Sequence, residues 1–445
     1  MEFRFDPHDR RLRIRTMAPP GQHARTFVAD ELFQFGIEEE YFLSDARTLQ
    51  AASRTPDALF QSADFGIAGH IGREFLQAQI EVATEPHRKA GDSKLELMWL
   101  RRNAAAAAAQ HELVILACGT HPLSSWRGSV QSPKDRYDKV MNELQMIGRR
   151  NMLCGMHVHV DLPDPSRRVD VMKRMLPYLP LFIALSTSSP FWQGRATGLK
   201  GYRLAAYDEL PRTGLPELFH NNAEYDAYVA AMLASGAMQD ASHLWWAIRP
   251  SLKYQTLELR APDCCTRIDD TIAIAALYRS LARFLFVNPD HNAEIDVVDR
   301  AIAVENKWQA QRYGTQGTFV TRSGGIAVGE LLNTVLDLVT ADAEVLECAD
   351  QVEYCRTIVS GGTSADAQLK IFTENKHEGA EIALHKVSRW ISDATLAPDC
   401  FSGLRSSDVP QADVGRWHRG VCFVPLTCQH KHTHQRSLGI AAVRH

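Results

Sequence analysis

Acidic and imidazole side chains recur at alternate positions in four segments of this chain, and they are the residues best suited to chemistry. In residues 33–43 the alternation predicts a β-strand with Glu38 and Glu40 on the face opposite to its apolar side chains. Glu39 falls on the apolar side, where a bulge or a buried ion pair would accommodate it. Two neighbouring carboxylates repel each other unless a cation or a shared proton offsets their charge. The pair therefore indicates a divalent metal site, although an isolated Glu-x-Glu is more often a solvated sheet edge.

Three further segments show the same alternation of apolar and polar residues. They cover residues 75–84, 153–161 and 255–261, and each has the length of a single strand. Their polar positions are Gln77, Gln79 and Glu81 in the first segment, His157, His159 and Asp161 in the second, and Thr256, Glu258 and Arg260 in the third. A merely solvated face usually favours Lys and Thr, so the set predicts a trough lined by acids and histidines.

Helical periodicity separates these strands and dominates the second half of the chain. Helices are expected over residues 92–110, 135–150, 169–186, 271–286 and 299–313, with two or three more before residue 391. The third of these is interrupted at Pro177 and Pro180, and residues 204–244 are expected to be mostly irregular. Strands with one apolar and one polar face suit an antiparallel sheet with helices on one side only. The predicted fold class is α+β, with an open trough on the other side.

Composition describes a globular protein. The 445 residues are 45% apolar and 23% charged, with a formal net charge of −4. This charge argues against a nucleic-acid binder with a basic surface, and no apolar run is long enough to span a membrane. The start of the chain lacks the apolar core of a secretory signal, and the nine cysteines have no metal-site spacing. We therefore expect reduced thiols and a cytoplasmic location.

Local composition divides the chain into three regions. Residues 1–30 are expected to form a flexible N-terminal extension, residues 31–392 the main domain, and residues 393–445 an irregular C-terminal tail. The tail contains a histidine-rich tract at residues 430–434, which we expect to be solvated rather than bound to metal. The sequence does not define the oligomeric state, and a homo-oligomer is compatible with it.

A trough that combines carboxylates with histidine would bind hard divalent cations and leave coordination positions free for phosphate oxygens. Mg²⁺ with ATP is the expected occupant, and Arg260 would hold the charge that develops on a transferred phosphoryl group. The ring nitrogen of His157 would equally suit Mn²⁺ or a zinc site. The chain has no Gly-x-x-x-x-Gly-Lys-Ser/Thr loop and no dinucleotide-binding glycine pattern, so ATP would have to bind in another way.

Nine short motifs follow one another along residues 31–390 in an order known from one family. They are Gly36-Ile37-Glu38-Glu39-Glu40, Gln77-Ala78-Gln79-Ile80-Glu81, Gly119-Thr120-His121-Pro122, Arg136-Tyr137, Gly155-Met156-His157-Val158-His159, Ser189-Pro190, Ile248-Arg249-Pro250-Ser251, Leu257-Glu258-Leu259-Arg260 and Arg312-Tyr313-Gly314. Each motif is weak alone. In this order they closely resemble the YbdK-type carboxylate-amine ligases, also called the type 2 glutamate-cysteine ligase family.

The resemblance implies a glutamine-synthetase-like fold: a curved antiparallel sheet with helices packed on one face and an ATP and metal funnel on the other. It also implies an ATP-dependent ligase for small-molecule substrates. ATP would phosphorylate a carboxylate, with the γ-carboxylate of glutamate as the expected case. An amine such as cysteine would then attack the acyl phosphate, giving γ-glutamylcysteine, ADP and phosphate.

Site roles follow from the resemblance residue by residue. It implies that the metal ligands are Glu38, Glu40, Glu81, His157 and Glu258. Arg260 is the implied phosphate clamp, with Arg249 and Arg312 as further catalytic candidates or structural ion pairs. Arg203, in a loop similar to a family substrate or nucleotide loop, and Gln79 are the implied nucleotide contacts. If His159 supports the sheet rather than the ion, its replacement by Asn should be milder than that of His157.

The chain departs from the family pattern at two positions. Gln77 stands where some members carry a glutamate, which removes one negative charge, and Gly201 replaces a more usual serine in residues 194–203.

Three other functions stay open at this stage. A small-molecule kinase on the same fold would use the trough but leave a stable phosphorylated product. A zinc-dependent hydrolase built on His157, His159 and Asp161 would be active without a nucleotide. A non-catalytic binding protein would not need the intact acidic set.

Overall fold

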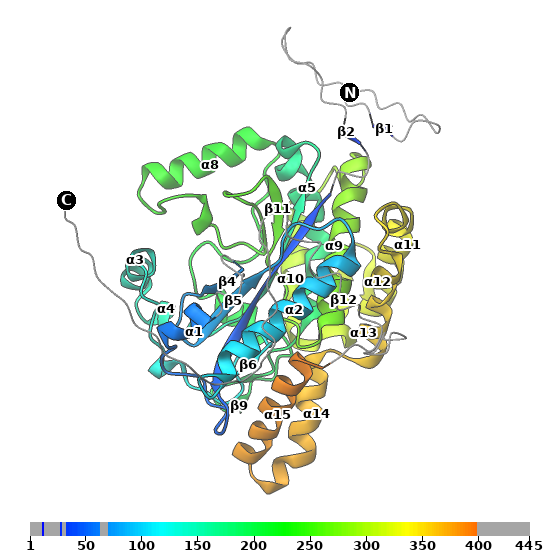
Figure 1. Cartoon of the computed structure of the whole chain (residues 1–445). Coiled ribbons are helices and arrows are strands. Elements are labelled where there is room, and N and C mark those ends of the chain that lie inside the picture. Colours follow the sequence, from blue (N-terminus) through cyan, green and yellow to red (C-terminus); the bar gives the residue numbers. More distant parts are fainter. Residues whose placement is uncertain (1–10, 13–26, 29–32, 63–69, 398–445) are drawn as a thin grey trace, which may run out of the picture. The chain divides into compact units, whose positions relative to one another are not determined.

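The computed structural model describes residues 11–12, 27–28, 33–62 and 70–397 (Figure 1). The tail predicted over residues 393–445 lies outside the described residues from residue 398 onward, and most of the extension predicted over residues 1–30 also lies outside them. Within that extension, strands β1 (Arg11–Leu12) and β2 (Phe27–Val28) pair antiparallel. The last helix, α15 (Ala380–Thr395), runs past the boundary predicted at residue 392.

A seven-stranded sheet lies at the centre of the main domain. Its strands are β10 (Ile248–Pro250), β11 (Thr256–Leu259), β7 (Met156–Asp161), β3 (Phe35–Asp45), β5 (Gln79–Ala83) and β4 (Ile71–Arg73), in this spatial order, and β6 (Leu113–Leu116), which pairs with the far end of β3. Every neighbouring pair is antiparallel, as the alternating pattern predicts. The short strands β4 and β10 were not predicted.

The strand register gathers the predicted polar residues on one face. The directly opposed pairs are Glu38 with His157, Glu40 with Glu81, Glu258 with His159, and Glu258 with Arg249. Opposed residues in antiparallel strands have Cβ atoms only about 4.5–5.5 Å apart. The register alone therefore brings side chains from five strands within reach of one another.

Two long helices cover the apolar face of the sheet (Figure 1). Helix α2 (Ala90–Ala109) packs on β3, β5 and β6, and α9 (Ile268–Val287) packs on β7 and on α2. Three helices, α11 (Val328–Val345), α12 (Ala349–Glu353) and α13 (Cys355–Gly361), pack against α9 in turn. The predicted α+β class with helices behind the sheet is confirmed.

The other elements connect or flank this core. The helices are α1 (Asp57–Ser62), α3 (Asp135–Leu144), α4 (Met146–Arg149), α5 (Arg168–Met175), α6 (Leu179–Ser186), α7 (Tyr202–Tyr207), α8 (Asn222–Ala234), α10 (Val297–Tyr313) and α14 (Ser364–Asn375). Two hairpins are formed by β8 (Phe191–Trp192) with β9 (Arg195–Ala196) and by β12 (Thr318–Thr321) with β13 (Gly324–Ala327). No helix among the described residues is both long and apolar enough to cross a membrane.

Several helix predictions need correction. Residues 204–244, predicted to be mostly irregular, contain one helix that was not predicted, α8, in which Tyr225 is the one buried residue. The helix predicted over residues 135–150 breaks at Gln145, whose φ of 53° is incompatible with a continuing right-handed helix. Five helices rather than two or three follow α10 in the described residues.

Glu39 points into the core and is fully buried. Arg101 on α2 donates to both carboxylate oxygens, at 2.9 and 2.6 Å, and the hydroxyls of Tyr41 and Thr271 donate at 2.5 and 2.6 Å. Further N–H groups of Arg101 donate to backbone carbonyls of Cys265, Thr266 and Thr395. The register of β3 is continuous through this position. The buried ion pair, and not a bulge, is therefore the correct alternative.

His121 has a structural role in the residue 119–122 motif. Its Nδ1 accepts the backbone N–H groups of Leu123 at 3.2 Å and Ser124 at 3.1 Å, and its Nε2 lies 3.0 Å from the Ser44 hydroxyl. Only the neutral imidazole leaves Nδ1 free to accept these bonds. Burial accordingly lowers the pKa of His121 to about 3.

The Arg101→Met substitution should strongly destabilise the protein, because it leaves the Glu39 carboxylate buried without its cation. We expect the free energy of unfolding, measured by urea denaturation, to fall by about 3–5 kcal/mol. The double substitution Glu39→Gln with Arg101→Met should recover part of this loss, since the unpaired charge is removed. A loss below about 1 kcal/mol for Arg101→Met would be typical of an exposed pair and would contradict the buried network.

Acid should destabilise the fold through His121. The unfolded chain takes up this proton near the ordinary histidine pKa of about 6.5, whereas the folded chain does so only near pH 3. The free energy of unfolding should therefore be greatest above pH 6.5 and fall on acidification, by up to about 1.4 kcal/mol per pH unit from this group. His121→Asn, which keeps an oxygen acceptor, should flatten the profile measured by denaturant unfolding. The exposed His377→Asn should not, and equal slopes for both variants would refute the role of His121.

Candidate active site

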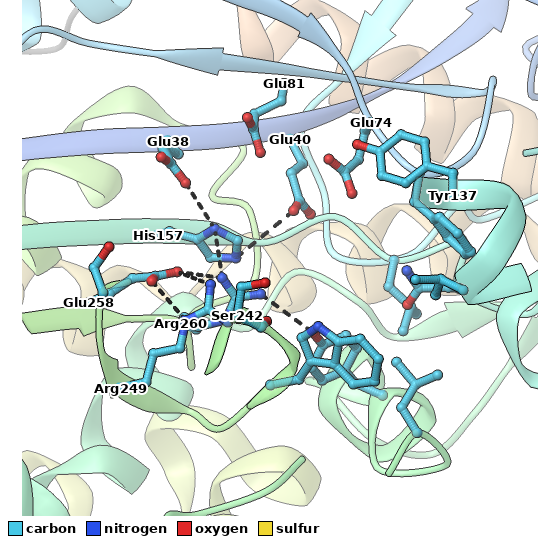
Figure 2. A pocket seen from close by; sticks show the side chains of 18 of the residues that line it. Glu38, Glu40, Glu74, Glu81, Tyr137, His157, Ser242, Arg249, Glu258 and Arg260 are labelled. Atoms are coloured by element: carbon cyan, nitrogen blue, oxygen red, sulfur yellow. Dashed lines mark hydrogen bonds and ion pairs between the residues drawn. The ribbon is translucent and has the colours of Figure 1, made fainter. Parts of the chain in front are cut away.

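The polar face of the sheet opens into a cavity of about 450 Å³ (Figure 2). Side chains of β3, β5, β7 and β11 and Glu74 form its acidic side, while residues of α3, α7, the segment 242–254 and neighbouring loops form the rest of its wall. The charged and imidazole groups that line it include Glu38, Glu40, Glu74, Glu81, Glu258, His157, His159, Arg136, Arg203, Arg249 and Arg260. The predicted trough therefore corresponds to one continuous cavity.

Glu38, His159 and Glu258 form the first acidic group, with one ligand atom from each lying within 4.8 Å of the others. They come from β3, β7 and β11, three adjacent strands. The Nδ1 of His159 lies 2.9 Å from the Thr256 hydroxyl, and its Nε2 lies 3.4 Å from Glu38. That Nε2 is buried and has no hydrogen-bond partner within the protein. This group could hold a divalent cation.

Glu40, Glu74 and Glu81 form the second acidic group, and their carboxylates also approach within 4.8 Å of one another. Glu40 and Glu81 are opposed on β3 and β5, and Figure 2 shows Glu74 beside Tyr137. Sequence reasoning missed Glu74. The available signal was its position directly after β4, where Gly72 opposes Glu81 and the alternate residue faces the same side. Three residues of strand were too few to reveal that alternation.

His157 lies between the two groups (Figure 2). Its Nδ1 is 3.3 Å from Glu38 and its Nε2 is 3.9 Å from Glu40. The Nε2 is buried and unpartnered within the protein. Burial, and then the charge of Arg260, lowers the pKa of His157 to about 4, so the ring is a neutral potential donor of a lone pair.

The second group is only partly compensated by nearby arginines. Burial and repulsion from Glu74 raise the pKa of Glu40 to about 7, and burial and the three neighbouring carboxylates raise the pKa of Glu81 well above its usual range. Burial also raises the pKa of Glu74. Carboxylates held this close can all ionise only if positive charge arrives between them. The donor set therefore fits a hard divalent cation.

The first group is compensated by the protein. Burial alone would raise the pKa of Glu38, but the close contacts of its carboxylate with the rings of His157 and His159, at 3.3 and 3.4 Å, outweigh it and hold the pKa well below the ordinary value. Burial likewise opposes ionisation of Glu258, but the charges of Arg260 and Arg249 outweigh it and lower its pKa. These two carboxylates are ionised whether or not a cation is bound.

Arg260 and Arg203 enter the cavity with hydrogen-bonding capacity left. Arg260 pairs with Glu258 through Nη1 and lies 3.4 Å from the Tyr207 hydroxyl through Nη2, while its buried Nε has no protein partner. Arg203 donates to the carbonyl of Pro262 at 3.1 Å, and its Nε is also unpartnered. A Cβ on Gly155 would lie 2.0 Å from Nη2 of Arg203, so only glycine leaves room for this guanidinium.

Two predicted site residues do not reach the cavity lining. Arg312 is exposed at the end of α10, where its guanidinium lies 4.9 Å from the ring centre of Tyr313. Gln79 is buried and donates to the carbonyl of Leu153 at 2.7 Å. It opposes Phe42, which packs edge-on against His121 and fills that end of the polar face. Gln77, the family departure, donates to the carbonyl of Gln131 and also lies outside the lining.

Apolar and aromatic side chains from α3 and from several other segments form another part of the cavity wall. Its apolar and aromatic lining residues are Phe75, Tyr137, Val140, Leu144, Leu153, Leu210 and Trp245. Such a wall suits the uncharged part of an organic ligand, while the acidic side suits cations and phosphate.

Comparison with known sequences identifies the family. Residues 34–386 match the family model described as glutamate-cysteine ligase family 2. A protein of Bradyrhizobium sp. (strain ORS 278), provisionally named glutamate-cysteine ligase 2, is 57% identical over 365 residues, which cover 82% of this chain and 88% of the relative. A relative of the same provisional name from Rhodospirillum rubrum is 41% identical over 379 residues, covering 83% of this chain and 97% of the relative.

Solved structures share the fold. The glutamate-cysteine ligase of Francisella tularensis, solved in complex with AMP, aligns with a TM-score of 0.62 at 14% identity, over 83% of this chain and 90% of that chain. A bifunctional glutathione synthetase from Pasteurella multocida aligns with a TM-score of 0.62 at 15% identity, over 82% of this chain and 53% of that chain. At this level of identity the agreement concerns the fold alone.

The family match favours the ligase over the kinase, the zinc-dependent hydrolase and the non-catalytic protein. The chain belongs to glutamate-cysteine ligase family 2 and is an ATP-dependent ligase of the carboxylate-amine type.

Proposed function

We propose that this enzyme joins the γ-carboxylate of glutamate to the amine of cysteine or a related amine, using Mg-ATP and an acyl-phosphate intermediate. The observation that carries the proposal is the pair of acidic groups, Glu38 with His159 and Glu258, and Glu40 with Glu74 and Glu81, in one cavity beside Arg260. The AMP bound to the Francisella ligase of the same fold supports a nucleotide in this cavity.

Two cation positions fit the donor sets. Glu38, His159 and Glu258 would supply the ligands of one, with His157 as a neighbouring nitrogen donor, and Glu40, Glu74 and Glu81 would supply those of the other. Mg²⁺ suits the second group in particular, because all of its donors are oxygen, while Mn²⁺ would also accept the nitrogen of the first. When bound, the cations would neutralise phosphate charge and polarise the transferred group.

The proposed reaction has two steps. A carboxylate oxygen of glutamate attacks the γ-phosphorus of ATP, and the bond from that phosphorus to the bridging oxygen breaks, which releases ADP. The amine nitrogen then attacks the acyl carbon, phosphate leaves, and the nitrogen loses a proton to give the amide. Arg260 and Arg203 line the cavity, each has one N–H group without a protein partner, and they would bind the phosphate oxygens through both steps.

The proposed reaction predicts a strict requirement for three substrates. With Mg-ATP and glutamate, release of ADP and phosphate should depend on an added amine, and mass spectrometry should detect the γ-glutamyl amide. A panel that includes cysteine and larger apolar amines would identify the preferred acceptor. A stable phosphorylated product formed without any amine would instead support the kinase.

Removing a carboxylate from either acidic group should abolish turnover without unfolding the protein. We expect Glu74→Gln, Glu81→Gln and Glu258→Gln each to lower the rate of ADP release at least about 100-fold. Each substitution removes a negatively charged oxygen ligand of the proposed cation. Asp135→Asn, which replaces an exposed acid outside the cavity lining, is the matched control. Full activity of Glu74→Gln, with wild-type dependence on Mg²⁺ concentration, would exclude the second cation position.

A further inference from the structure

Nearly all of the hydrogen-bonding capacity of Arg249 is used within the protein. Its Nε and Nη2 donate to the two oxygens of Glu258 at 2.8 and 3.1 Å, and its Nη1 donates to the carbonyls of Ser242 and Leu244 at 2.7 and 2.9 Å. A guanidinium has five N–H groups, so four are engaged. Arg249 therefore cannot offer the two-pronged contact by which arginine grips a phosphate or a carboxylate of a ligand.

The two ends of this contact lie in different parts of the cavity. Glu258 belongs to the first acidic group, whereas Ser242 and Leu244 belong to residues 240–246, which we call the wall loop. The wall loop contributes Ser242 and Trp245 to the cavity lining. The Ser242 hydroxyl also accepts a hydrogen bond from Arg136 of α3 at 2.7 Å. Arg249 is thus a direct bridge from the acidic side to the apolar side.

Glu258 has limited room for a cation. A carboxylate has about four lone-pair positions. Arg249 occupies two of them, and Arg260 donates to the same oxygen that Nη2 of Arg249 contacts. A cation that binds Glu258 must take the remaining position or displace a guanidinium. Either event changes the geometry of the hydrogen bonds between Glu258 and Arg249. It therefore also changes the position of Nη1 relative to the carbonyls of Ser242 and Leu244.

We propose that Arg249 is a positioning residue that couples cation binding at Glu258 to the conformation of the wall loop. The inference rests on the proposed function in one respect, namely that a cation binds the first acidic group. Because such coupling is reciprocal, an ordered wall loop would also favour the cation. The enzyme would then complete the apolar wall for its organic substrate only when the cation site is occupied.

Trp245 provides a readout that does not depend on activity. It lies on the wall loop and lines the cavity, so its fluorescence reports the state of the loop. The chain contains eight tryptophans, and the difference between wild type and Trp245→Phe isolates this one. Titration of wild type with Mg²⁺ alone, at constant ionic strength, should shift the Trp245 emission. Hydrogen exchange of residues 240–246 in wild type should slow over the same Mg²⁺ range.

Arg249→Lys is the decisive variant. Lysine keeps the positive charge but cannot contact both Glu258 oxygens and both carbonyls at once. We expect the Mg²⁺-dependent shift of Trp245 to be lost while calorimetry still detects Mg²⁺ binding. Arg212→Lys is the matched control, because Arg212 also holds the wall loop, through the His243 carbonyl at 3.1 Å and the Trp245 ring at 5.3 Å. The partners of its side chain are Glu143, His243 and Trp245 and do not include Glu258, so its response should equal that of wild type.

The outcomes separate this inference from the proposed function. If wild type and Glu258→Gln bind the same amount of Mg²⁺, no cation binds at Glu258, and the proposed cation site is refuted. If Mg²⁺ binds at Glu258 but leaves both Trp245 emission and loop exchange unchanged in wild type, the coupling is refuted and the site stands. An unchanged Trp245 response in Arg249→Lys would assign the coupling to another residue. Should Arg249→Lys fail to fold, the exchange measurement on wild type still decides whether cation binding orders the wall loop.

Discussion

Repulsion between buried carboxylates is the constraint on which the rest of the structure depends. The sheet holds five glutamates in one cavity, and the protein compensates them unequally. Histidines and arginines keep Glu38 and Glu258 ionised, whereas burial and mutual repulsion raise the pKa values of Glu40 and Glu81. The fold therefore lacks positive charge beside Glu40 and Glu81, and a bound cation would stabilise that position most.

The opposite face of β3 explains how the strand tolerates this repulsion. Between Glu38 and Glu40, the Glu39 side chain points to the other side and is fixed by Arg101, which also bonds carbonyls near the start of α9 and at the end of α15. One strand thus combines a fully satisfied ion pair behind the sheet with two carboxylates in front of it that face the cavity. A rigid support of this kind holds the carboxylate oxygens in place before a cation or substrate binds.

Alternation in the sequence was sufficient to predict the sheet and most of the cavity floor. A period of two assigns every side chain of a strand to a face, so Glu38, Glu81, His157 and Glu258 could be grouped without knowledge of the pairing.

Glu74 could not be found this way, because β4 is only three residues long. The rule also admitted Gln79, which shares the polar face but bonds Leu153 instead. Arg312 came from the family motif, and the direction of a side chain at a helix end is not encoded in a motif. Helix α8 was missed because its alanines and Leu233 spread apolar residues around the whole helix, which hides the stripe of Tyr225, Tyr228, Val229 and Met232 that packs on the core.

Arginine identity alone does not define a role in this cavity, whereas the count of free N–H groups does. Arg249 spends its donors on Glu258 and two carbonyls, so it can transmit a displacement but has little capacity to bind a ligand. Arg260 lies against the same carboxylate, yet its Nε remains without a partner in the described protein, and the same is true of Arg203. An unpaired buried donor is costly unless a ligand accepts from it. An anion that accepts from these two side chains would lower this cost, and cations between the anion and the acidic groups would offset the repulsion of their charges. The unpaired guanidinium donors and the crowded carboxylates therefore fit the ligand proposed above, a polyphosphate accompanied by divalent metal.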